Sequence, residues 1–285
     1  MIEKAYAKIN LTLNVIGQRE DGYHDLETVM LPLLLHDSIN ITISKQRSDF
    51  DFVVCDDFVF KITKYNLCHK MLNACRKKWD IKETFSVILH KNIFIQAGLG
   101  GGSADAAAVL RAVIKLMHIT DYTDEDIKEL CESCGSDVYF QYYNQTALVE
   151  GKGDRVTFIT TPFKPYVLLV KPEDGTSTAD IFLKFSDYGD FADYPATKVK
   201  EYIGSNIGLK ELQPLIHNSL LETATSYVPT INVILEQLKE FGFECYNMCG
   251  SGSCCFALTH DKKFLKKAYK YFSKLGYDVE MTKVI

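Results

Sequence analysis

Four glycines within five positions are the strongest chemical signal in the chain, namely Gly98, Gly100, Gly101 and Gly102. They stand between the apolar segment 93–97, which we expect to be a buried strand, and a helix of small residues that begins at Ser103. Backbone N–H groups that converge at a helix N-terminus bind anions, phosphate above all. A plain glycine linker is the alternative, but a linker is not expected between a buried strand and a buried helix. The cluster therefore predicts phosphate binding.

Two common glycine loops do not fit this cluster. A Walker loop needs Lys and then Ser or Thr after its last glycine, whereas Gly102 is followed by Ser103 and Ala104. A dinucleotide fold places a second strand before its acidic residue, and only a short segment that ends in Ile119-Thr120 separates Asp121 from the helix. The loop is therefore neither a P-loop nor a Rossmann loop.

Polar groups suited to catalysis occur near both ends of the chain. Residues 4–15 alternate between apolar and polar types, which predicts a half-buried strand with Lys8 and Asn10 on its wetter face. Gly250-Ser-Gly-Ser253 predicts a tight turn, a weak signal by itself because hairpins often use such residues.

The remaining patterns predict a mixture of helices and strands. Alternating apolar residues indicate strands at 38–44 and 84–90, while helical spacing and caps indicate helices at 66–79, 103–117 and 123–134. The chain ends in a strand–strand–helix–strand pattern, with segments 245–248, 254–258, 261–275 and 277–284. This order predicts an α+β fold. Six of the seven prolines follow residue 160, which predicts domains at 1–160 and 161–285.

Composition excludes several classes of protein. The chain has 285 residues, 47% of them hydrophobic, and a formal charge of −5, which argues against disorder and against a nucleic-acid scaffold. We see no membrane-spanning stretch, and Glu3, Lys4 and Lys8 interrupt any signal peptide, so we expect a cytoplasmic protein. Nine cysteines without secretory context favour reduced thiols. Zinc at Cys131-x-x-Cys134 is a disfavoured alternative to small buried side chains, and no side-chain metal ligand is assigned.

Five motifs in order resemble those of the GHMP kinase superfamily. They are Ala7-Lys-Ile-Asn-Leu11, Asp21-Gly-Tyr-His24, Ala97-Gly-Leu-Gly-Gly-Gly-Ser-Ala-Asp-Ala-Ala107, Gly135-Ser-Asp-Val138 and Gly250-Ser-Gly-Ser253. The resemblance is closest to the branch that phosphorylates the 2-hydroxyl of diphosphocytidyl methylerythritol with ATP and Mg²⁺, in the non-mevalonate isoprenoid pathway. It implies a ribosomal-S5-like N-terminal domain and a ferredoxin-like C-terminal domain.

The resemblance also implies a role for each motif residue. Asp137 matches the catalytic aspartate that accepts or orients the hydroxyl proton, and Lys8 matches the lysine that stabilises developing charge and keeps Asp137 ionised. A solvated strand charge for Lys8 and a helix cap for Asp137 are the plain structural alternatives. The matches to the ATP-binding positions are Asn66, Leu67, Ala97, Gly98, Leu99, Gly100, Gly101, Gly102 and Ser103, with Ser103 supplying a hydroxyl for phosphate or Mg²⁺.

The implied substrate-binding residues are Asn10, Tyr23, His24, Thr178, Phe182, Gly250 and Ser251. Tyr23 is expected to stack on the cytosine, with Phe182 as a second stacking position and His24 bonding the base edge. The partners implied are therefore ATP and a cytidine diphosphate derivative.

The chain departs from the family pattern at several positions. Phe94 and Tyr139 stand where the family usually has proline, Asn144-Gln145 where glycines are common, and Ser219 where Asp is usual. None of these changes removes Lys8 or Asp137. Two alternatives stay open, a non-catalytic nucleotide-binding protein and a kinase of a mevalonate-type or homoserine-type alcohol. The Asp21–His24 motif argues against the second alternative, because those relatives have no cytosine to hold.

Overall fold

The computed structural model describes residues 1–44, 51–56, 66–188, 191, 194–205 and 208–285. It divides into two compact units, each assembled from separate segments of the chain. Unit 1 contains residues 1–7, 35–93 and 100–144, and unit 2 contains residues 8–34, 94–99 and 145–285. The predicted division into domains at 1–160 and 161–285 stays a prediction.

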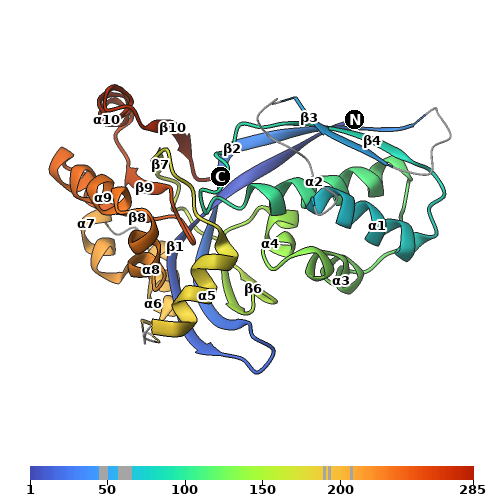
Figure 1. The fold of residues 1–285 in the computed structure, drawn as a ribbon, viewed down its shortest axis with the longest axis horizontal. Helices are drawn as coiled ribbons and strands as arrows, with labels where there is room; N and C mark the ends of the chain where they lie inside the picture. Colours follow the sequence, from blue (N-terminus) through green and yellow to red (C-terminus); the bar gives the residue numbers. More distant parts are fainter. Residues whose placement is uncertain (45–50, 57–65, 189–190, 192–193, 206–207) are drawn as a thin grey trace. The chain divides into compact units, whose positions relative to one another are not determined.

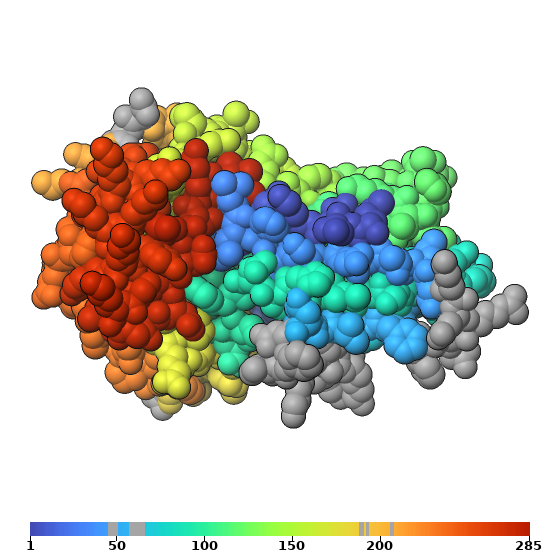
Figure 2. All heavy atoms as spheres, turned by 90° about the horizontal axis from the view of Figure 1, so that it is seen from above, coloured from blue at the N-terminus to red at the C-terminus, as the bar shows by residue number. Residues whose placement is uncertain are grey.

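A six-stranded sheet contains the long N-terminal hairpin. Its strands are β1 (Ile2–Gln18), β2 (His24–Ile43), β3 (Phe52–Cys55), β4 (Phe85–His90), β5 (Ala147–Gly151) and β6 (Arg155–Phe158). The order is β3-β4-β2-β5-β6, and β1 pairs with β2. β3 runs parallel to β4, against which it lies in the space-filling view (Figure 2). β1 and β2 are long enough to pass through both units.

In the part of unit 1 that the structure describes, four helices accompany these strands. They are α1 (Leu67–Trp79), α2 (Gly101–Leu116), α3 (Asp124–Cys134) and α4 (Val138–Tyr143), and they lie on one face of the strands of this unit (Figure 1). A capping box begins α3, since Asp126 N–H donates to Thr123 Oγ1 and Thr123 N–H donates to the Asp126 carboxylate. α2 begins two residues earlier than predicted. Ser103 therefore lies in its first turn.

Unit 2 contains a second sheet with the predicted C-terminal pattern. β7 (Tyr166–Lys171), β8 (Cys245–Met248), β9 (Cys255–Thr259) and β10 (Asp278–Lys283) pair antiparallel in the order β10-β7-β9-β8. Counted along the chain this order is 4-1-3-2. With the helices that connect β7 to β8 and β9 to β10, it is the ferredoxin-like arrangement that the family resemblance implies.

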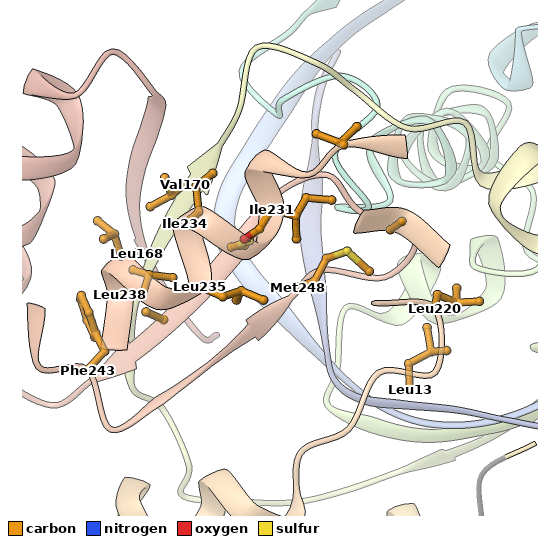
Figure 3. Packing of buried hydrophobic residues seen from close by; sticks show 14 of the residues in the cluster. Leu13, Leu168, Val170, Leu220, Ile231, Ile234, Leu235, Leu238, Phe243 and Met248 are labelled. Atoms are coloured by element: carbon orange, nitrogen blue, oxygen red, sulfur yellow. The ribbon is translucent and has the colours of Figure 1, made fainter. Parts of the chain in front are cut away.

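Helices α9 (Thr230–Phe241) and α10 (Lys262–Lys274) pack on this sheet and enclose the main core of unit 2. Leu168 and Val170 of β7 meet Ile234 and Leu238 of α9 in this core (Figure 3). The other helices of the unit are α5 (Thr178–Tyr188), α6 (Ala196–Gly204), α7 (Leu209–Leu212), the 3₁₀ helix η1 (Gln213–Leu215) and α8 (Leu221–Tyr227). The core holds β8 and β9, and therefore also the Gly/Ser turn between them.

Two predictions about local structure are wrong. Segment 93–97 is not a strand but a turn, in which Gln96 has a φ of 53° and its carbonyl accepts the Thr176 N–H. Lys8 and Asn10 do not lie on a wet face of β1, because only Lys4 and Tyr6 of the alternating polar positions are exposed or half-buried, and the positions from Lys8 to Asn14 are buried. Polar partners within unit 2 cover that face, a tertiary effect that alternation in one strand cannot reveal.

Phe272 provides a test of the unit 2 core. Its ring is fully buried in α10, so we expect Phe272→Ala to lower the free energy of unfolding by about 3–5 kcal/mol. The neighbouring Tyr271 is 44% exposed, and we expect Tyr271→Ala to cost about 1 kcal/mol. Denaturant unfolding of both variants measures the difference. Equal losses would contradict this description of the core.

Candidate active site

A buried polar chain holds the side chain of Lys8. Its Nζ donates to Asn10 Oδ1 at 2.7 Å, and Asn10 Nδ2 donates to Thr28 Oγ1 at 2.9 Å. Lys8 is only 5% exposed. Because a charge is screened less when it is removed from water, this ammonium interacts strongly with any anion that approaches it. The alternative of a solvated strand charge is therefore wrong.

The glycine loop and the Gly/Ser turn touch each other beside Lys8. Gly98 has a φ of 73°, and a Cβ placed on it would lie 1.9 Å from the Cys249 carbonyl oxygen. A Cβ on Gly250 would lie 2.9 Å from the Gly98 carbonyl oxygen and 3.3 Å from Lys8 Nζ. The Lys8 N–H donates to the Leu99 carbonyl at 3.0 Å. Three motifs separated by about 90 and 150 residues thus meet through backbone contacts, and the approach at Gly98 is one that only glycine permits.

The Gly/Ser turn is held by polar side chains, including one that the sequence did not single out. Thr178 Oγ1 and Ser251 Oγ are 2.9 Å apart, and Thr176 Oγ1 donates to the Ser251 carbonyl at 3.0 Å. Asn218 was missed. Its Nδ2 donates to the carbonyls of Met248 and Gly250 at 3.1 and 2.9 Å. The only signal was the neighbouring departure at Ser219, which marks the segment without identifying the amide.

The aromatic residues predicted for the substrate side differ in exposure. Tyr23 is 58% exposed, and Lys152 Nζ lies 6.0 Å from the centre of its ring. His24 is buried, with Nε2 3.0 Å from Ser186 Oγ and its ring 5.3 Å from that of Phe182. Burial lowers the pKa of His24 below its usual value near 6.5, so this imidazole is neutral at pH 7. The structure thus brings His24 and Phe182 together and leaves the Tyr23 ring open to a ligand.

The predicted nucleotide residues of unit 1 lie close together. Asn66 caps α1 by accepting the Cys68 N–H, which places Leu67 at the first turn. A Cβ on Gly102 would lie 3.8 Å from Leu67 Cδ1, and one on Gly135 would lie 4.0 Å from both Leu67 Cδ1 and Ser103 Oγ. The first turns of α1 and α2 therefore approach the segment that leads to Asp137.

Asp137 occupies the N-cap position of α4, but its side chain makes no capping hydrogen bond to the helix N-terminus. The carboxylate of Asp137 therefore does not serve as a helix cap. The departure at Tyr139 has a structural explanation, since its hydroxyl donates to Asp124 Oδ2 at 2.7 Å and so ties α4 to the start of α3. Nothing in the structure explains Phe94.

A cavity of about 910 Å³ in unit 2 is lined by none of the predicted site residues, although Asn218, which holds the Gly/Ser turn, lies at its wall. Tyr194 and His217 form a stacked pair at its wall. In the described ranges, no group of three or more His, Cys, Asp or Glu side chains is arranged to hold a metal ion, and no helix is long and apolar enough to cross a membrane. Cys131 and Cys134 are buried free thiols of α3 whose pKa values are raised by desolvation.

Known proteins that resemble the chain identify its family. The models of the GHMP kinases N-terminal domain and of the GHMP kinases C-terminal domain match residues 66–145 and 201–278. A 4-diphosphocytidyl-2-C-methyl-D-erythritol kinase of Bacillus cereus is 33% identical over 99% of this chain and 96% of its own. The kinase of the same name from Clostridium kluyveri is 34% identical over the full length of both chains.

Solved structures share the fold at lower identity. A crystal structure of 4-(cytidine 5'-diphospho)-2C-methyl-D-erythritol kinase matches with a TM-score of 0.80 at 24% identity, covering 100% of this chain and 99% of that one. The mevalonate kinase of Methanococcus jannaschii matches with a TM-score of 0.72 at 14% identity, covering 100% and 98%. The chain belongs to the GHMP kinase family and, within it, to the 4-diphosphocytidyl-2-C-methyl-D-erythritol kinases. The predicted α+β fold of this family is confirmed.

Gly98 provides a test of the contact between motifs. In Gly98→Ala the new methyl group would overlap the Cys249 carbonyl, so the loop must move. We expect nucleotide affinity to fall at least about tenfold, since a loss of 1.4 kcal/mol is sufficient for that. Gly276→Ala is the matched control, because Gly276 has a φ of 88° with nothing within 4 Å of an added Cβ. Equal nucleotide affinities of the two variants, measured by calorimetry, would contradict the role of this contact.

Proposed function

We propose that the protein transfers the γ-phosphoryl group of ATP to the 2-hydroxyl of 4-diphosphocytidyl-2-C-methyl-D-erythritol. The full-length relatives that carry this activity in their names support the substrate. The observation that carries the proposal is the contact of Gly98 with Cys249 and Gly250 beside the buried Lys8, because it brings anion-binding backbone and a cation together. Phosphoryl transfer requires mainly such positioning and charge stabilisation.

Asp137 and Lys8 carry the chemical step in this proposal. Asp137 accepts the proton of the attacking hydroxyl, for which its half-buried carboxylate, not used as a helix cap, is suited. The Lys8 ammonium stabilises negative charge that develops on the transferred group. Asn10 orients that ammonium through the 2.7 Å hydrogen bond, and Thr28 orients the Asn10 amide in turn.

Nucleotide binding is assigned to the glycine loop and to its neighbours in unit 1. The N–H groups of the first turn of α2 face the phosphates, and Asn66 and Leu67 line the adenine pocket. The predicted positions 97–103 thus act together as the phosphate loop. The closeness of Leu67 to Gly102 supports this assignment, because Leu67 is predicted to contact the adenine and Gly102 the phosphates of the same ATP molecule.

The donor groups beside this loop fit Mg²⁺. The Ser103 hydroxyl lies by Gly135, two residues before the Asp137 carboxylate, and hard oxygen ligands of this kind hold Mg²⁺ together with substrate phosphates. When bound, the ion would neutralise charge on the β- and γ-phosphates. The chain's contribution would be the Ser103 hydroxyl, and Asp137 keeps its role as the proton acceptor. Among the residues that the structure describes, no group of three or more His, Cys, Asp or Glu side chains is arranged to hold a metal ion.

The cytidine end of the substrate is assigned to unit 2. Tyr23 stacks on the base with its exposed ring, while the neutral His24 and the adjacent Phe182 form the edge-recognition and second stacking positions. Thr178, Ser251 and Gly250 contact the ribose and diphosphate, which the 2.9 Å contact between the Thr178 and Ser251 hydroxyls supports.

Asp137 tests the chemical mechanism. We expect Asp137→Asn to lower kcat by about 10³-fold, since a positioned general base contributes about 10²–10⁴-fold, while ATP still binds. Lys8→Ala should lower kcat severely as well. Release of ADP with the purified alcohol substrate measures both. An Asp137→Asn enzyme with wild-type kcat would exclude the assigned base.

Tyr23 tests the position of the cytidine. We expect Tyr23→Ala to raise KM for the alcohol substrate about tenfold, because base stacking contributes about 1–3 kcal/mol, and to leave KM for ATP unchanged. Tyr227→Ala is a matched control, since that ring is similarly exposed, at 52%, and has no assigned role. If the two KM values rise equally in Tyr23→Ala, the base is bound elsewhere.

A further inference from the structure

A buried group of three charges lies beneath the start of α2. Lys91 Nζ contacts Asp37 Oδ2 and lies 2.7 Å from Asp105 Oδ2. The three side chains are only 7%, 0% and 4% exposed. We call this group the Lys91 triad. None of its members has a role in the proposed reaction, and all three belong to unit 1.

The triad connects the end of β4 to the first turns of α2. Asp37 of β2 accepts the N–H groups of Asn92 and Ile93 at 2.6 and 2.8 Å through Oδ1, so it also fixes the segment after β4. Asp105 lies four residues after Gly101, one helical turn on. A Cβ on Gly101 would lie 3.5 Å from Lys91 Nζ. The ammonium therefore lies directly against the backbone that begins the phosphate-binding helix.

This arrangement is costly for stability alone. One ammonium and two carboxylates carry a formal charge of −1 inside the protein, and buried charges often contribute no more than apolar residues of the same size. Asp105 Oδ1 is buried and accepts no hydrogen bond among the residues that the structure describes. Desolvation raises the pKa of the Asp105 carboxyl, which is consistent with an unfavourable environment for its charge.

We propose that Lys91 is a positioning residue for the nucleotide: bound between Asp37 and Asp105, it fixes the first turn of α2 so that its N–H groups meet the phosphates of ATP. Lys91 does not itself contact phosphate in this assignment, because both of its carboxylate partners already engage the ammonium. The inference rests on the proposed use of the loop for ATP. In this assignment the geometry of the loop depends on the Lys91 triad. Asp105 belongs to one of the five motifs, but Lys91 and Asp37 belong to none of them.

A charge-conserving double variant tests the proposal. Lys91→Met/Asp105→Asn removes the connection to α2 and leaves Asp37 with its two N–H donors, so the buried formal charge stays −1. We expect the variant to fold, as judged by circular dichroism, and to bind ATP at least about tenfold more weakly by calorimetry. KM for the alcohol substrate should change less than about twofold, a selectivity that general destabilisation would not produce.

The matched control is Lys78→Met/Glu129→Gln. Lys78 also bridges two carboxylates, of Asp126 and Glu129 at 2.6 and 2.8 Å, but at the surface. We expect its ATP affinity to equal that of the wild type. Lys91→Arg is the second variant, because it keeps the charge and the partners while placing a larger group against Gly101. It should fold and bind ATP about fivefold more weakly.

The outcomes separate this inference from the proposed function. A wild-type protein that does not bind ATP in the calorimeter contradicts the proposed function. If the wild type binds ATP and the folded double variant binds it equally well, the positioning role is wrong. Should the double variant fail to fold, Lys91→Arg decides, and wild-type ATP affinity in that variant overturns the proposal.

Discussion

The close approach of Gly98 to the Cys249 carbonyl is the constraint on which the rest of the site depends. No side chain fits at that point, and the φ of 73° is one that residues other than glycine rarely adopt. The contact sets where the phosphate loop lies relative to Lys8 and to the Gly/Ser turn. The packing of α9 and α10 on the second sheet holds β8 and β9, and so fixes the carbonyl against which Gly98 rests.

Charge explains why the protein needs so many local donors. Its formal charge of −5 repels ATP and a cytidine diphosphate derivative, so binding depends on local groups and not on the overall field. Lys8 is buried and held by Asn10, and the loop contributes N–H groups with positive partial charge. In its proposed positioning role, the Lys91 triad serves the same end, because it holds the start of the helix whose N–H groups meet the phosphates.

Local patterns in the sequence predicted many of the secondary-structure elements and part of the candidate site. The cap of α3, the C-terminal ββαβ unit and the glycine loop follow from residue types at fixed spacing, which is why Thr123 and Gly98 could be assigned before the fold was known. The capping role of Asn66 at α1 was not predicted. Tertiary partners could not be predicted in the same way. The buried polar face of β1, the turn at 93–97 and the amide of Asn218 depend on segments that lie far away in the chain.

The central claim is that this fold positions ATP for transfer to one particular hydroxyl. Phosphorus NMR of the product formed from ATP and 4-diphosphocytidyl-2-C-methyl-D-erythritol tests it most directly. The account predicts a single new monoester signal, with coupling and carbon shifts that place the phosphate on the 2-hydroxyl, and one ADP released per product. ATP hydrolysis without a new phosphate ester, or a phosphate on another hydroxyl, would contradict it.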